Sequence, residues 1–158
     1  MGTGDDVGPE TRNDLKISIR VRSHLRYSDL FHTVLGQVAR LVPLPPERLD
    51  WIALSLREAV NNAVLHGNKN DFTKWVEVEM EVSGSVFTIR VWDEGAGFSP
   101  GVLSDPRRPE NLFKPNGRGI FLIRQFTDHA DFARSADGRF GICMSVDLDS
   151  AKDKEADE

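Results

Sequence analysis

Apolar and polar residues alternate along the stretch "LKISIRVRSHL", from Leu15 to Leu25. Successive side chains of a strand point to opposite faces, so this period of two predicts a strand with one solvent-exposed face. The same alternation recurs in "WVEVEMEVSG" and in "SVFTIRVWD", which a Ser-Gly-Ser turn separates. These two segments therefore predict a β-hairpin whose first strand turns Val76, Val78, Met80 and Val82 inward.

Two other segments repeat their apolar residues at helical spacing. The first, "SDLFHTVLGQVARLV", opens on Ser28, a residue type that caps helices. The second follows "PLPPE", begins near Pro46, which suits a first helical turn, and extends to about His66, where Gly67 stops it. The residues expected on the buried side of the first helix are Leu30, Phe31, Val34, Leu35, Val38 and Leu41.

The last third of the chain predicts one helix and a second hairpin. "GRGIFLIRQFTDHA" opens on glycines, and "ADFARS" and "RFGICMSVDL" flank an Ala-Asp-Gly turn. Before that helix, residues 94–116 are loop-like, and a loop of this length is usually functional. Strands grouped in hairpins with helices between them predict an α+β fold, a two-layer sandwich whose mixed, mostly antiparallel sheet is covered by helices on one face.

Length and composition narrow the class of protein. The 158 residues favour one domain, here placed at 14–148, with a disordered segment at 1–13 and a charged tail at 149–158. A net charge of -5 disfavours a broad nucleic-acid surface. No segment approaches the ~20 apolar residues that cross a bilayer, and the start has no signal-peptide layout. We therefore expect a cytoplasmic protein that binds neither membrane nor nucleic acid directly.

Glu58 and Asn62 stand four residues apart in the second predicted helix and so share one face. A hydrogen-bonded pair or an exposed stripe would explain them. Alternatively, the Asn62 amide oxygen is a ligand for Mg²⁺, which prefers oxygen and commonly bridges to nucleotide phosphates. Glu58 would then lie near those phosphates as a general base.

Two glycine-containing motifs add to this picture. In "VWDEGAGF", Asp93 ends a strand; it is either part of a turn or a buried acceptor for the exocyclic amine of adenine, with Gly95 and Gly97 allowing close approach. In "PNGRGIFLIRQF", Gly117 and Gly119 open a helix, as a flexible cap or as a phosphate site made by free N–H groups and the helix dipole.

Together, E-x-x-x-N on a helix, D-x-G-x-G after a strand, a long loop and a G-x-G helix resemble the GHKL (Bergerat-fold) ATPases over roughly residues 15–148. Within them, "LREAVNNAVLHGN" and "GRGIFLIRQFTDHADF" are similar to motifs of the RsbW-type anti-sigma factors, which are serine-protein kinases. The chain differs from many of these relatives in its last hairpin, where "DGRFGICM" has no threonine.

The resemblance implies an ATP- and Mg²⁺-dependent serine/threonine-protein kinase that holds a sigma factor inactive and phosphorylates an anti-anti-sigma (STAS) partner. A homodimer is a further expectation. A non-catalytic nucleotide-dependent binding module and an ATPase domain of a larger sensor kinase remain alternatives. By position, Glu58 would be the catalytic base and Asn62 the metal ligand. The expected nucleotide-contacting residues are Asn61, Asn62, Asp93, Gly95, Gly97, Phe98, Asn116, Gly117, Arg118, Gly119 and Ile120.

Overall fold

The computed structural model describes residues 14–97 and 115–149, and the side chains of all of these except 115–118. Five strands form one sheet in the order β1-β2-β3-β5-β4, and every neighbouring pair is antiparallel. No parallel pair occurs among these strands, so the sheet in the described part is simpler than the mixed one expected. The strands are β1 (Leu15–Arg22), β2 (Trp75–Ser83), β3 (Val86–Asp93), β4 (His129–Arg134) and β5 (Phe140–Asp147).

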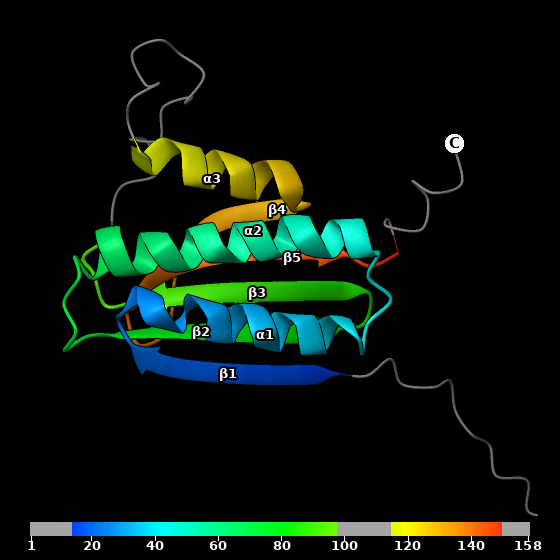
Figure 1. Ribbon diagram of the computed structural model, residues 1–158, viewed down its shortest axis with the longest axis horizontal. Helices are drawn as coiled ribbons and strands as arrows, with labels where there is room; N and C mark the ends of the chain where they lie inside the picture. Colours follow the sequence, from blue (N-terminus) through cyan, green and yellow to red (C-terminus); the bar gives the residue numbers. More distant parts are fainter. Residues whose placement is uncertain (1–13, 98–114, 150–158) are drawn as a thin grey trace, which may run out of the picture.

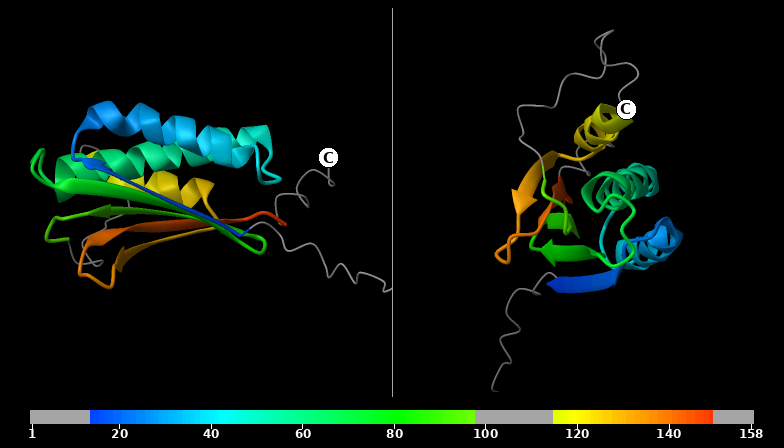
Figure 2. Two further views of the ribbon diagram at one scale, coloured as in Figure 1. Left: turned by 90° about the horizontal axis from the view of Figure 1, so that it is seen from below. Right: turned by 90° about the vertical axis from the view of Figure 1, so that its left-hand side faces the viewer.

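Three helices cover one face of this sheet, which confirms the predicted two-layer α+β fold (Figures 1 and 2). They are α1 (Ser28–Ala39), α2 (Pro46–Asn62) and α3 (Pro115–Phe126). A 3-10 turn, η1 (Leu25–Tyr27), precedes α1, and a π-helical turn, η2 (Ala63–Gly67), continues α2. No helix in the described part is long and apolar enough to cross a membrane.

The core lies between the helices and the inward side of the sheet. Residues of β2 alternate between buried and half-buried, as the period of two predicts. The largest fully buried side chains come from both layers, so burial of apolar surface holds the layers together. They include Phe31, Leu35, Ile52, Leu56, Met80, Phe87, Ile89, Ile123 and Met144.

The structure corrects the start of α1. The strand before it ends at Arg22 rather than Leu25. The expectation that Ser28 caps α1 is wrong, because Tyr27 holds the N-cap position and makes no side-chain cap. The side chain of His24 instead caps the short turn η1, accepting a hydrogen bond from the backbone of Arg26. The extra 3-10 turn therefore moves the capping side chain upstream of the helix proper.

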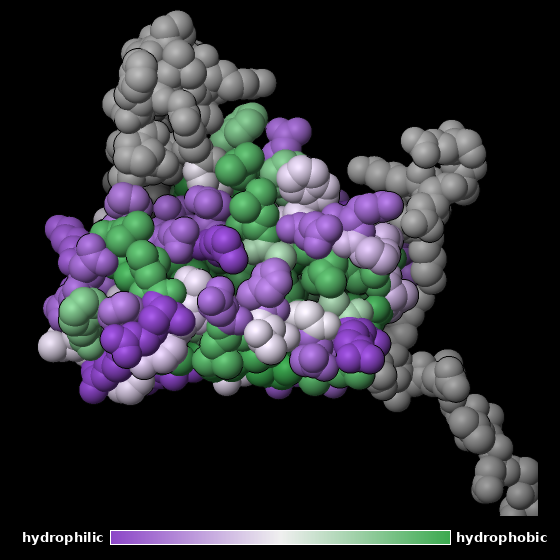
Figure 3. All heavy atoms as spheres, viewed as in Figure 1, coloured by the Kyte–Doolittle hydropathy of each residue, from purple (hydrophilic) through white to green (hydrophobic). Residues whose placement is uncertain are grey.

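The predicted buried stripe of α1 is also too wide. Leu30 is 43% exposed and Leu41 is 62% exposed, and Leu41 lies beyond the end of the helix. Figure 3 views this side of the molecule, where apolar patches lie between hydrophilic side chains. Helix α1 covers the β1–β2 edge of the sheet, so only the central part of its apolar side meets the core (Figure 1).

The end of α2 differs from the simple glycine stop that the sequence predicts. Regular α-helix ends at Asn62, and the chain widens into the π-helical turn η2 before it leaves the helix. Beyond this turn, the residues that adopt left-handed backbone are Lys69 (φ 53°) and Asn70 (φ 58°). Gly67 closes η2 without a left-handed conformation, so its lack of a side chain has another cause, which the site explains below.

Charged residues occupy the face of the sheet that the helices leave open. Arg90 bonds Glu81 at 2.7 Å, and Arg139 pairs with Glu77 across the strands. Arg139 also lies over the ring of Trp92, which is only 6% exposed although it is on this open face. These ion pairs connect different strands on the solvent-facing side of the sheet.

Gly141 of β5 is the point at which this packing tolerates no side chain. A carbon added there would lie 2.1 Å from the carbonyl oxygen of Val91 and 2.7 Å from the ring of Trp92. We expect Gly141→Ala to lower the free energy of unfolding by at least about 1–3 kcal/mol, because backbone would have to move. Urea denaturation measures this.

Gly36 of α1 is the matched control, because a carbon added there meets nothing within 4 Å. Gly36→Ala should raise the free energy of unfolding by about 0.5–1 kcal/mol through helix propensity. Equal urea midpoints for Gly141→Ala and the wild type would contradict the packing described here.

Candidate functional site

Helix α2 divides its side chains between the core and the site. Leu56 and Val60 are buried in the core, whereas Glu58 and Asn62 are half-buried and lie next to α3. A carbon added at Gly119 of α3 would lie 3.0 Å from Oε2 of Glu58 and 3.2 Å from Nδ2 of Asn62. The backbone of α3 therefore rests directly on the two polar residues that the sequence singled out.

The amide of Asn62 is incompletely satisfied. Its Nδ2 is buried and has no hydrogen-bond partner within the described residues. A half-turn of the amide would present its oxygen at the same place, so the side chain can offer an acceptor or a donor there. A buried polar atom without a partner is costly in a protein interior, and this one fits a group that a ligand completes.

The same side chains fit a magnesium ion that is shared with a bound nucleotide. Among the residues that the structure describes, no group of three or more His, Cys, Asp or Glu could hold a metal by itself. Mg²⁺ keeps several waters and is usually bound through one or two protein oxygens together with phosphates. The amide oxygen of Asn62 is of the donor type that such a site uses.

Asp93 is the second centre of the site and lies at the end of β3. Its carboxylate is 6% exposed, and Oδ1 accepts a hydrogen bond of 2.7 Å from the backbone N–H of Gly95. Burial raises the pKa of Asp93 to about 6, although the Gly95 bond and the charge of Lys74 act in the opposite direction. The Gly95 bond engages Oδ1, so Oδ2 can still accept a hydrogen bond from a ligand.

Two glycines enclose that carboxylate. A carbon added at Gly67 would lie 2.3 Å from Cγ of Asp93, and one added at Gly95 would lie 2.2 Å from the carbonyl oxygen of Gly67. The end of η2 and the turn after β3 thus approach more closely than any residue with a side chain allows. This contact explains Gly67, which the sequence interpretation assigned to stopping the helix.

Asn68 connects the same two segments, and the sequence interpretation missed it. It is fully buried, its Oδ1 accepts from the N–H of Glu94 at 2.8 Å, and its Nδ2 donates to the carbonyl of Trp75 at 2.9 Å. Its backbone N–H donates to the carbonyl of Ala63 at 2.8 Å. It stood inside a motif quoted for the resemblance, but nothing in the local pattern separates a buried asparagine from a loop asparagine.

The last hairpin holds the far end of the turn. Arg134 of β4 donates to the carbonyl of Ala96 at 3.1 Å and lies over the ring of Phe140. Gly97 has φ +73°, and a carbon added to it would meet Phe140 at 2.7 Å. The segment from Asp93 to Gly97 is therefore fixed on both sides, and Arg134 is a second residue that sequence reasoning missed.

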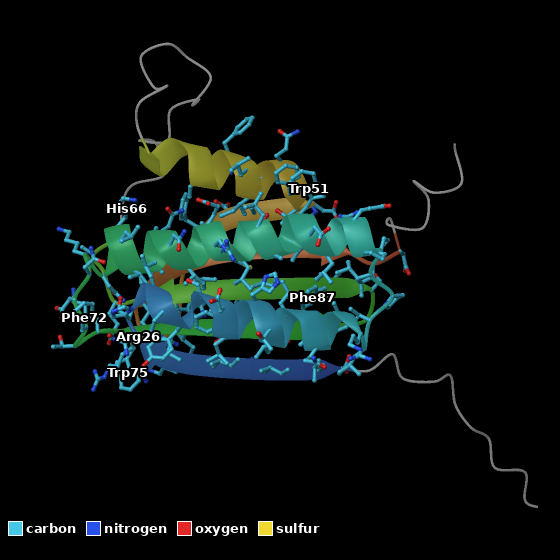
Figure 4. All side chains as sticks on the ribbon, in the orientation of Figure 1. Arg26, Trp51, His66, Phe72, Trp75 and Phe87 are labelled. Carbon is cyan, nitrogen blue, oxygen red and sulfur yellow. The ribbon has the colours of Figure 1, made fainter. Side chains whose placement is uncertain are left out.

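The predicted residues fall into two groups along one helix. Glu58, Asn62 and Gly119 form the first, and Asp93 with Gly95 forms the second, beside Gly67 at the end of the same helical segment. In Figure 4 that end is marked by His66. Two polar groups at different points of one helical segment would suit an elongated ligand that is polar at both ends.

Other predicted residues have different outcomes. Ile120 is 6% exposed and belongs to the core, and Asn61 is half-buried on α2. Gly97 lies in the turn held by Phe140. Asn116, Gly117 and Arg118 fall in the first turn of α3, where only the backbone is described, and Phe98 lies outside the described residues.

Comparison with known proteins adds independent information. The family model of the histidine kinase-like ATPase domain matches residues 21–146. The anti-sigma F factor of Geobacillus stearothermophilus is 31% identical over 121 residues, which cover 74% of this chain and 80% of that protein. The anti-sigma F factor of Clostridium perfringens is 29% identical over 122 residues, covering 75% and 85%. That of Shouchella clausii is 33% identical over 98 residues, covering 60% and 65%.

The buried charge of Asp93 should cost stability when no ligand is bound. The folded protein binds the proton more tightly than the unfolded chain, whose carboxyl has an ordinary pKa near 3.8. For this group, stability is therefore highest below about pH 4 and falls as the pH rises through about 6. The loss at pH 8 amounts to about 3 kcal/mol, from 1.36 kcal/mol for each pKa unit.

We expect Asp93→Asn to remove this cost, since the amide oxygen still accepts from Gly95 and carries no charge. The variant should gain up to about 3 kcal/mol of unfolding free energy at pH 8 and about half as much at pH 5. Urea denaturation at the two pH values measures the difference. A gain that is absent at pH 8, or equal at both pH values, would count against a raised pKa for Asp93.

Proposed function

The chain belongs to the histidine kinase-like ATPase domain family, and from that premise we propose that it is an ATP-binding anti-sigma factor with protein kinase activity. The observation that carries the proposal is the alignment of two polar groups along α2 and η2. At one end, the buried carboxylate of Asp93 can bind a nucleobase. At the other end, Asn62, Glu58 and the N-terminus of α3 can bind phosphates and their metal ion.

Asp93 is the residue that recognises the adenine ring. Its second oxygen, Oδ2, is free of the Gly95 bond and can accept a hydrogen bond from the exocyclic amine. Guanine has a carbonyl oxygen at that position, which would face the carboxylate with repulsion between two acceptors. Discrimination by an unpaired buried acceptor is far stronger than discrimination by shape alone.

The phosphates of the nucleotide are assigned to the group that Glu58, Asn62 and Gly119 form. The N-terminal turn of α3 contains Gly117 and Gly119, and its free N–H groups and dipole favour an anion. Asn62 holds the Mg²⁺ through its amide oxygen, with Asn61 as its half-buried neighbour. When bound, the ion neutralises charge on the β- and γ-phosphates.

Glu58 is the general base for transfer of the γ-phosphoryl group. It stands one turn before Asn62 and faces the same part of α3. From there its carboxylate takes the proton of a serine or threonine hydroxyl while that oxygen bonds to the γ-phosphorus, the bond from the γ-phosphorus to the bridging oxygen breaks, and ADP leaves. The hydroxyl belongs to an anti-anti-sigma STAS protein, and the sigma factor is the second partner, as the names of the relatives support.

A second function is favoured by one observation. The last hairpin reads "DGRFGICM", and the place where relatives carry a threonine has none. The alternative is a binding module that retains ATP and the sigma factor but transfers no phosphoryl group. Both functions require the adenine site at Asp93, which we call the base pocket. Only phosphoryl transfer requires Glu58.

Asp93→Asn tests the base pocket. We expect ATP affinity to fall by at least about 30-fold, because an acceptor is lost and a donor is placed against the amine. Isothermal titration calorimetry at pH 8 measures it. The gain in folding stability expected for the same variant separates lost binding from lost structure. Unchanged affinity would reject the pocket.

The wild-type protein supplies the matching pH test. Its ATP affinity should weaken about tenfold for each pH unit below about 6, since a protonated Asp93 accepts poorly. A flat affinity between pH 5 and pH 8 would contradict Asp93 as the adenine acceptor.

Glu58→Gln distinguishes the kinase from the binding module. With γ-labelled ATP and the STAS partner, we expect transfer to fall by about 10²–10⁴-fold while ATP affinity changes little. Asn62→Ala is the companion variant and should remove the dependence of ATP binding on Mg²⁺. Wild-type protein that binds ATP and the sigma factor but labels no partner supports the binding module instead.

A further inference from the structure

Three hydrogen bonds form a closed ring beside the base pocket. Asn68 accepts from the N–H of Glu94 and donates to the carbonyl of Trp75. The ring closes because the N–H of Trp75 donates to Oε2 of Glu94 at 2.5 Å. It joins the end of η2, the first residue of β2 and the turn after β3, which are three separate segments of the chain.

The ring is built around an amide that no other side chain replaces. At this buried place one atom must accept and the other must donate, at a distance that a two-carbon side chain spans. An aspartate would place a carboxylate oxygen against the carbonyl oxygen of Trp75. An alanine would leave the N–H of Glu94 and the carbonyl of Trp75 unpaired. Asn68 is 0% exposed, so water cannot take over these bonds.

The position of the ring bears on Asp93 through its two neighbours. Gly67 directly precedes Asn68, and Gly95 directly follows Glu94. These glycines are the two that enclose the carboxylate, and Gly95 also donates to its Oδ1. The Asn68–Glu94 bond therefore fixes the distance between the two walls that set where the free oxygen of Asp93 lies.

We propose that Asn68 is a positioning residue for purine recognition, which sets the preference for a 6-amino purine by holding Gly67 and Gly95 on either side of Asp93. The inference rests on the proposed function. It does not require Asn68 to touch the nucleotide, and it assigns the residue to specificity rather than to general stability.

The test compares ADP with inosine diphosphate, which has a carbonyl oxygen in place of the 6-amino group. Competition with a fluorescent ADP gives the ratio of the two affinities. We expect the wild type to prefer ADP by at least about tenfold, and Asn68→Ala to lose most of that preference, in keeping with the value of a charge-assisted hydrogen bond. The pH midpoint of ADP binding should also move upward, as the Gly95 bond to Asp93 weakens.

Leu35→Ala is the control for lost stability. Leu35 is also 0% exposed, and it lies in the apolar core on α1, outside the ring. The truncation should lower the free energy of unfolding and leave the ADP preference and the pH midpoint unchanged. A fall in preference equal to that of Asn68→Ala would mean that stability alone sets the ratio, which would overturn the proposal.

Glu94→Ala covers the case in which Asn68→Ala does not fold. Glu94 is exposed, and its side chain makes only the third bond of the ring. It should shift the ratio in the same direction by a smaller factor. A ratio within twofold of wild type in every folded ring variant overturns this inference alone, whereas a wild type that binds no ADP overturns the proposed function with it.

Discussion

The site depends on keeping one carboxylate buried and charged. Asp93 accepts one hydrogen bond from a backbone N–H and has a raised pKa, so its charged form opposes folding by an amount that matters to a domain of this size. Such a group persists only where its surroundings prevent it from turning to water. Here the surroundings are backbone: Gly67 on one side and Gly95 on the other, both too close to Asp93 for a side chain.

The two-layer fold places that enclosure apart from the group that Glu58, Asn62 and Gly119 form. The antiparallel sheet fixes the end of β3, and α2 crosses the same region with its apolar side in the core. Leu56 and Val60 anchor the helix, so the half-buried Glu58 and Asn62 keep their direction without strong contacts of their own. One continuous helical segment thus sets the spacing between Asn62 and Gly67, the contact of Asp93.

The sequence predicted what periodicity and local motifs determine. Alternation gave the strands within a few residues, and the polar pair in α2 gave Glu58 and Asn62, which α3 then meets at Gly119. It could not predict contacts between segments far apart in the chain. The closeness of Gly67 to Asp93 spans 26 residues of sequence separation, from the difference of the two numbers, and the local pattern of a helix end reads Gly67 as a stop signal.

The roles of Asn68 and Arg134 in the site could not be predicted from the sequence for the same reason. An asparagine just after a helix and an arginine near a turn are ordinary surface residues by pattern, and their meaning comes from partners on other strands. The π-helical turn at the end of α2 is a related case. In this turn the N–H of Asn68 donates to the carbonyl of Ala63, five residues earlier, and no capping residue in the sequence predicts it.

These details explain how a costly group is confined. The charge of Asp93 opposes folding, but its effect stays within a turn that Asn68 and Glu94 hold from one side and Arg134 holds from the other. The apolar core between the layers is built from other residues, so this turn depends on its hydrogen bonds rather than on the packing of α2 on the sheet. In the proposed function, the amine of adenine would donate to the second oxygen of Asp93, and binding would offset the cost of burying that charge.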